Sequence, residues 1–167
     1  MANAKTLKSR LASGEFDARL KEVYLSDKAV EDQKKRDAVI IDEFVRLFGD
    51  NDSIELFSAP GRTEVGGNHT DHNHGKVLAA SVDLDTVAAA AKRDDGIIVE
   101  KSFKFDALEV DISDLEVHTE EFGKSSGLIR GMCAGFKERG YNIGGFNAAS
   151  MSRVLSGSGL SSSAAAA

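Results

Sequence analysis

Residues 57–75, with the sequence FSAPGRTEVGGNHTDHNHG, constrain the fold of this chain more than any other stretch. They contain its only proline and three of its four histidines, together with several glycines and two carboxylates. Turn-forming and hydrogen-bonding residues at this density, directly after a short apolar run, are typical of a loop that forms a site. We therefore expect the chemistry of the chain to lie here.

The composition is that of a soluble globular protein. At 167 residues, with 41% hydrophobic and 29% charged residues, the chain can bury a core as one domain. Its formal net charge of -6 argues against non-specific binding of nucleic acid and indicates small partners. We see no membrane span and no secretory signal, and the single cysteine, Cys133, cannot form an intrachain disulfide. A reducing, cytoplasmic setting is therefore expected.

The first part of the chain is expected to be helical. Over residues 1–50, apolar residues recur at helical spacing, Ser26 is a candidate N-cap, and Gly49 is a candidate C-terminal stop. The charged run 31–37 is expected to be a solvated face of this helix. We place a boundary between a helical segment, 1–52, and the remaining domain, 53–167.

The rest of the chain predicts several strands and one more helix. A strand over 53–59 leads into the glycine-rich loop at Pro60. Further strands are expected at 77–91, 97–102, 106–112 and 146–155, and the turn at 94–96 predicts that the first two of these form a hairpin. A helix with Ser125 or Ser126 as its N-cap, ended by Gly140, would bury one stripe of residues: Leu128, Ile129, Met132, Cys133 and Phe136. Cys133 is then a core thiol.

This order of elements favours an α+β fold, with helices packed on a mixed sheet, over a doubly wound sheet. The four alanines at 164–167 would begin a helix that is too short to repay its nucleation cost. We expect the chain to be the N-terminal part of a longer protein.

A second glycine-rich segment, 157–163, follows the last expected strand and precedes that helix. Its glycines allow the backbone to approach phosphate oxygens closely, and the N–H groups at a helix start favour negative charge. Serine hydroxyls can donate to phosphate or bind Mg²⁺. A Gly/Ser tail without a ligand is the alternative, and the segment lacks the lysine of a Walker loop.

Two motifs together resemble a known family of kinases. Ala59-Pro60-Gly61-Arg62, followed by Gly67-Asn68-His69-Thr70-Asp71 and then by Asn73 and Gly75, closely resembles the sugar-binding signature of galactokinases. The segment SGSGLSSSAA, 156–165, resembles the glycine-serine nucleotide loop of the GHMP kinase superfamily. The resemblance covers residues 53–167 and implies the N-terminal domain of a GHMP-type kinase.

The resemblance implies ATP-dependent phosphorylation of the anomeric hydroxyl of galactose, with Mg²⁺. By position, Arg62 would stabilise the transferring phosphoryl group, a role that suits a fixed guanidinium. Asn68, His69 and Asp71 would line the sugar pocket, where they supply both donors and acceptors. The residues that would hold the nucleotide phosphates are Gly157, Ser158, Gly159, Leu160, Ser161, Ser162 and Ser163. Ser162 is the preferred Mg²⁺ ligand, with Ser161 and Ser163 as alternatives.

Four positions depart from the galactokinase pattern: Glu64, Gly66, Asn68 and His72 stand where the family usually has Asn, Ile, Glu and Tyr. Asn68 exchanges a carboxylate, a pure acceptor, for an amide that both donates and accepts. A related sugar, or a sensor that binds sugar and nucleotide without turnover, is therefore an alternative to galactose phosphorylation. The family's catalytic aspartate and acidic Mg²⁺ ligand follow the glycine-serine loop, so we expect the isolated chain to be inactive.

A metal-dependent hydrolase is the third alternative. His69, Asp71, His72 and His74 are the donor types that bind zinc, although hydrolases usually present them in another order. The kinase-like motifs make this reading the least favoured of the three.

Overall fold

A computed structural model describes residues 2–67, 70, 73–103 and 105–154. Three helices come first, α1 (Ala4–Ala12), α2 (Asp17–Tyr24) and α3 (Asp27–Phe48), which confirms the helical prediction for this part of the chain. The Ser26 hydroxyl caps α3 by accepting from the backbone N–H of Ala29 at 3.2 Å. Gly49 ends the same helix with a φ of 80°, which glycine adopts without strain.

A mixed five-stranded sheet follows, and the fold is α+β as predicted. Its strands are β1 (Glu55–Gly66), β2 (Leu78–Lys92), β3 (Ile97–Ser102), β4 (Leu108–Asp111) and β5 (Phe146–Ser152). Their order in the sheet is β1-β2-β5-β3-β4. β5 pairs with β2 in the antiparallel and with β3 in the parallel direction, so the last strand of the described residues lies at the centre of the sheet.

The predicted hairpin between the second and third strands is wrong. β2 and β3 follow each other in sequence across the Asp94–Asp95 turn, but β5 lies between them in the sheet. Thus Val99 of β3 and Ala91 of β2 both pair with Asn147 of β5. A turn signal shows where the chain reverses, but it does not show whether a later strand separates the two arms.

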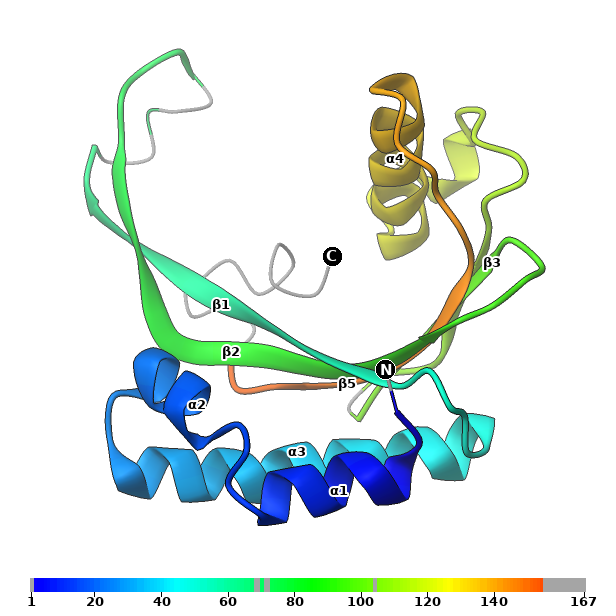
Figure 1. The fold of residues 1–167 in the computed structure, drawn as a ribbon. Helices are drawn as coiled ribbons and strands as arrows, with labels where there is room; N and C mark the ends of the chain where they lie inside the picture. The colour runs from blue at the N-terminus through cyan, green and yellow to red at the C-terminus, as the bar shows by residue number, and fades with distance from the viewer. Residues whose placement is uncertain (1, 68–69, 71–72, 104, 155–167) are drawn as a thin grey trace.

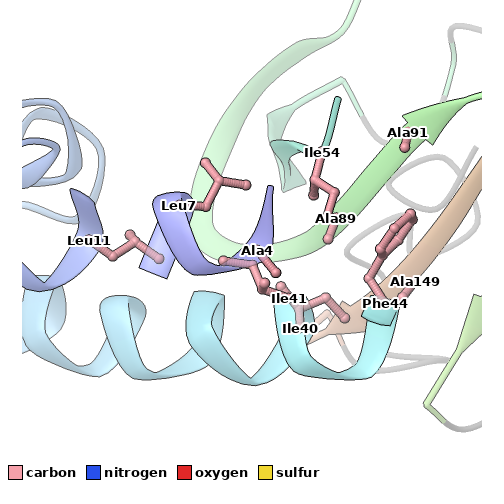
Figure 2. Close-up of a cluster of buried hydrophobic side chains, with 10 residues drawn as sticks. All are labelled: Ala4, Leu7, Leu11, Ile40, Ile41, Phe44, Ile54, Ala89, Ala91 and Ala149. Carbon is pink, nitrogen blue, oxygen red and sulfur yellow. The ribbon is translucent and has the colours of Figure 1, made fainter. Parts of the chain in front are cut away.

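The helices α1, α2 and α3 cover one face of the sheet, while α4 (Ser125–Glu138) lies on the other side (Figure 1). The core between α1, α3 and the sheet contains Phe44, Ile40 and Ile41, each at most 1% exposed, against small residues of β2 and β5 (Figure 2). Ala89 and Ala149 are both fully buried. Alanines on the sheet leave room for the large side chains of α3. No helix in the described ranges is long and apolar enough to cross a bilayer.

The prediction that 31–37 forms a solvated face is wrong for three of its residues. Gln33, Arg36 and Asp37 are only 1%, 5% and 6% exposed. Their partners are polar groups of the sheet and of α3 itself, which the local charge pattern could not indicate.

α4 also differs from its prediction. Its N-cap is Lys124 rather than a serine, and no side chain caps the helix. Ile129 and Cys133 pack on the small core formed by β3 and β4, but Leu128 and Phe136 are 46% and 51% exposed. The thiol of Cys133 is half-buried, and its burial raises its pKa, in agreement with a core thiol rather than a reactive one.

Candidate active site

The Pro60-Gly61-Arg62 motif lies within a strand rather than in a loop. β1 continues through Gly66, so the expected start of the glycine-rich loop at Pro60 is wrong by several residues. A proline has no N–H to donate to a ladder, but β1 is an edge strand and tolerates it. Arg62 is thereby held on a paired strand, and its side chain is exposed.

The pairing of β1 with β2 is interrupted at this motif. Pro60 lies opposite Asp85, but the next pair is Arg62 opposite Ser81, so Gly61 alone lies opposite residues 82–84 of β2. Extra residues on one strand bend it and increase its twist. Figure 1 shows both strands curving away from the helix layer beyond this region. Gly61 is buried at the irregularity.

The loop between β1 and β2 is organised around Thr70. Its hydroxyl donates to the carbonyl oxygen of Gly67 at 2.8 Å, and its own carbonyl oxygen accepts from the backbone N–H groups of Asn73 and Gly75 at 3.0 and 2.8 Å. Gly67 has a φ of 123°, and a Cβ there would lie 2.7 Å from the Cα of Val77. The two ends of the loop are therefore in close contact, and Thr70, Asn73 and Gly75 are held at the end of the β1–β2 ribbon.

The structure describes only some of the predicted site residues. Arg62 is described, and no described side chain forms an ion pair with it. Asn68, His69 and Asp71 lie outside the described residues, as does the whole predicted phosphate segment from Gly157 to Ser163, with its Mg²⁺ candidate Ser162. Their roles stay predictions.

The alternative metal site gains no support. His69, Asp71 and His72 lie outside the described residues, and the remaining member, His74, is exposed. Within the described part of the chain, no group of histidine, cysteine and carboxylate side chains could hold a metal ion.

A buried polar cluster lies between the helix layer and the β1–β2 ribbon, and the sequence did not predict it. We define it as Tyr24, Arg36, Asp85 and Ser58, of which the first three are buried and Ser58 is exposed at its edge. Arg36 forms an ion pair with the Asp85 carboxylate, and both side chains are nearly inaccessible. The other oxygen of that carboxylate accepts from the hydroxyls of Tyr24 and Ser58 at 2.5 and 2.6 Å.

Arg36 also bonds to the backbone of two strands. Its second amino group donates to the carbonyl oxygens of Asp85 and Met151 at 2.9 and 2.6 Å. The Asp85 carbonyl oxygen also accepts from the N–H of Arg153 at 2.9 Å. One guanidinium therefore joins α3 to the middle of β2 and to the end of β5, just before the chain continues toward the predicted phosphate segment.

The cluster changes the proton affinity of its members. Burial would raise the pKa of Asp85, but hydrogen bonds from Ser58, Tyr24 and Arg36 outweigh it and hold this pKa below its usual value. Burial and the contact with Asp85 raise the pKa of Tyr24. Asp37 lies beside the cluster, and burial raises its pKa to about 6 although Gln33 donates to it at 2.6 Å.

One signal for this cluster was present in the sequence. Asp85 stands within the run 77–91, which is otherwise mostly apolar and small. A carboxylate inside such a strand must be paired if it is buried. The sequence does not say which cation pairs with it, because Arg36 lies in a distant helix.

The β1–β2 ribbon lies within a segment that matches a known protein family. The family signature described as "Galactokinase galactose-binding signature" matches residues 42–92, which include all of β1, the loop and β2. The chain is 34% identical over 131 residues to the galactokinase of Lactococcus lactis subsp. cremoris and 33% identical over 125 residues to that of Bacillus subtilis. The chain is a relative of the galactokinases. The two matches cover 76% and 72% of this chain, but the chain spans only about a third, 32%, of each relative's length.

Solved structures agree with this relationship. The crystal structure of L. lactis galactokinase complexed with galactose matches this galactokinase relative with a TM-score of 0.65 at 34% identity, over 77% of this chain and 34% of that one. The mevalonate kinase of Methanococcus jannaschii matches with a TM-score of 0.52 at 16% identity, over 68% of this chain and 37% of that one, which shows a shared fold alone. The fold is thus that of the GHMP kinases. Tyr24 and Arg36 of the buried polar cluster precede the residues that match the family signature, whereas Ser58 and Asp85 lie within them.

Proposed function

We propose that the complete protein is an ATP-dependent sugar kinase that transfers the γ-phosphate of ATP to the anomeric hydroxyl of galactose or a related sugar. The observation that carries the proposal is that the galactose-binding signature contains the whole of one structural unit, the β1–β2 ribbon and its loop. Arg62 lies on this unit as an exposed cation on a paired strand. A relative of this chain was crystallised with galactose.

In this proposal Arg62 stabilises the negative charge of the transferring phosphoryl group. Phosphoryl transfer depends on positioning and charge stabilisation more than on covalent chemistry, so a held guanidinium is a suitable group. Asn68, His69 and Asp71 would contact the sugar hydroxyls, because short polar side chains supply both donors and acceptors. The amide of Asn68 adds a donor to the pocket, which is why we include a related sugar.

The nucleotide would be held by Gly157 to Ser163, with Ser162 as the Mg²⁺ ligand. The donor set fits, since backbone N–H groups and hydroxyls bind phosphate oxygens and Mg²⁺ prefers oxygen ligands. ATP supplies the phosphoryl group, and Mg²⁺ neutralises charge on its oxygens. Because the chain spans about a third of its relatives' length, we propose that the 167 residues alone do not catalyse the transfer.

The test is ADP release by the complete protein, extended to the length of its relatives, in MgATP with a panel of hexoses. We expect turnover that depends on galactose or a close relative of it. Arg62→Ala should lower it by about a thousandfold and leave a low residual rate, whereas Arg46→Ala, which removes an exposed arginine of α3, should leave it unchanged. Turnover by the isolated 167-residue chain would contradict the proposal that it is inactive.

The same assay distinguishes the sensor that Asn68 favours. A sensor would bind sugar and nucleotide, as measured by calorimetry, and release no ADP with any hexose. An Asn68→Glu variant that then gained turnover would assign the difference to this one position, because the substitution restores the carboxylate that galactokinases usually have.

A further inference from the structure

The buried polar cluster lies next to the interruption of the β1–β2 ladder. Asp85 belongs to the cluster and is also the residue opposite Pro60, the last pair before the interruption. The first pair beyond it is Arg62 with Ser81. Only Gly61 therefore separates the anchored part of β1 from the arginine that the proposed function uses.

Cluster contacts hold both strands on the near side of this interruption. On β1, the Ser58 hydroxyl donates to the Asp85 carboxylate at 2.6 Å. On β2, Asp85 is held through its side chain and its backbone, because Arg36 bonds to its carboxylate and, at 2.9 Å, to its carbonyl oxygen. Side chains of β1 and β2 thus join the two strands just before the interruption of their hydrogen-bond ladder between Pro60 and Arg62.

A buried ion pair is a costly way to stabilise a fold. Removal of two charges from water offsets most of their attraction, and apolar residues of similar volume often serve equally well for stability. Where such a pair is kept, one attested use is to specify a single geometry. Here Arg36 and Asp85 select one placement of β2 against α3, which the apolar contacts of small alanine side chains on that strand would define less well.

We propose that Arg36 and Asp85 are positioning residues for Arg62. They fix the strand pair immediately before the Pro60–Gly61 interruption, and so they set the direction in which β1 carries the Arg62 guanidinium. The inference rests on the proposed function, because it assigns the cluster a role in the same phosphoryl transfer. Neither residue touches the reacting groups in this proposal.

The test is a double-mutant cycle in the complete protein with MgATP and the best hexose. Arg36→Met removes the ion pair and keeps a long apolar side chain. A displaced catalytic group can lower the rate about a hundredfold, so we expect kcat to fall by about ten- to a hundredfold. KM for sugar and for ATP should change by less than about threefold, because an interaction used mainly in the transition state is lost. Arg46→Met, on the same helix but at the surface, should leave all three constants unchanged.

The deciding comparison is made in the Arg62→Ala background. If Arg36 acts through Arg62, the Arg36→Met change should lower the residual rate there by less than about threefold, because residues that act through one another are not additive. An equal loss of kcat in both backgrounds would overturn the inference and leave the proposed function standing. A rise in KM without a loss of kcat would also overturn it.

Two further variants keep the test decisive if Arg36→Met does not fold. Tyr24→Phe and Ser58→Ala each remove one hydrogen bond to the Asp85 carboxylate and leave the ion pair in place. Each should lower kcat by several-fold in the parent protein and have no effect in the Arg62→Ala background. A complete protein that turns over no hexose would refute the proposed function, and the positioning role would fall with it.

Discussion

Arg36 and Asp85 form an ion pair across the interface between α3 and β2, with side chains that are only 3% and 4% exposed. The pair joins the helix layer to β2, which lies within the galactose-binding signature. Because the partners come from different layers, this contact couples the packing of α3 to the geometry of the sheet.

Loss of one partner of this pair should be strongly destabilising. Arg36→Met leaves the Asp85 carboxylate buried without its cation, and breaking a buried pair costs about 3–5 kcal/mol. The free energy of unfolding, measured by urea denaturation of the 167-residue chain, should fall by about that amount. Arg46→Met should change it by less than about 0.5 kcal/mol. Adding Asp85→Asn to Arg36→Met should recover part of the loss, and a double variant no more stable than the single one would contradict this account.

Asp37 should make the chain less stable at neutral pH than in mild acid. Burial raises its pKa to about 6 from an ordinary value of 3.8, so the folded chain binds a proton that the unfolded chain has lost. Stability attributable to this group is therefore greatest below about pH 4 and falls as the pH rises to about 6. Each pKa unit corresponds to about 1.4 kcal/mol, so the penalty at pH 7 is at most about 3 kcal/mol.

Asp37→Asn removes this titration while its amide oxygen can still accept from Gln33. Urea denaturation at a series of pH values should show a gain of about 1–3 kcal/mol at pH 7 and none near pH 4. Asp32→Asn, which changes an exposed carboxylate of the same helix, should show no gain at either pH. A gain that is the same at both pH values would contradict the assignment to Asp37.

Gly67 and Gly66 are adjacent but should respond differently to substitution by alanine. Gly67 has a φ of 123°, and a Cβ there would lie 2.7 Å from both the Cα and a side-chain carbon of Val77. A Cβ on Gly66 would meet nothing within 4 Å. We expect Gly67→Ala to lower the free energy of unfolding by about 1–3 kcal/mol through backbone strain, with little effect of Gly66→Ala. Thermal denaturation of both variants checks this, and equal midpoints would count against the loop geometry.

Phe44 should be the most costly single truncation in the core under the sheet. Its side chain is 1% exposed and packs beside Phe48, with ring centroids 5.2 Å apart. Phe44→Ala should lower the free energy of unfolding by about 3–5 kcal/mol because it leaves a cavity. The matched control is Phe105→Ala, since Phe105 is 66% exposed, and its effect should be small. Similar losses in both variants would show that the core is not where the structure places it.

The sequence alone determined where the helices and strands lie along the chain, apart from the extension of β1 to Gly66 and the cap of α4, and it determined the relationship to galactokinases. Local signals sufficed because each acts over a few residues: the Ser26 cap, the Gly49 stop and the contiguous motif around Pro60 and Arg62. The α+β class followed from the order of these elements.

Tertiary structure alone decided the order of the strands in the sheet and which charged residues of α3 are buried. Insertion of β5 between β2 and β3 depends on pairing between distant segments, which a turn signal cannot encode. Arg36 belongs to a charge run of the kind usually found in solvent, yet it is buried, because its partners Asp85 and Met151 lie 49 and 115 residues away in sequence. Charge patterning describes a residue's neighbours along the chain, whereas burial depends on which groups folding brings to it in space.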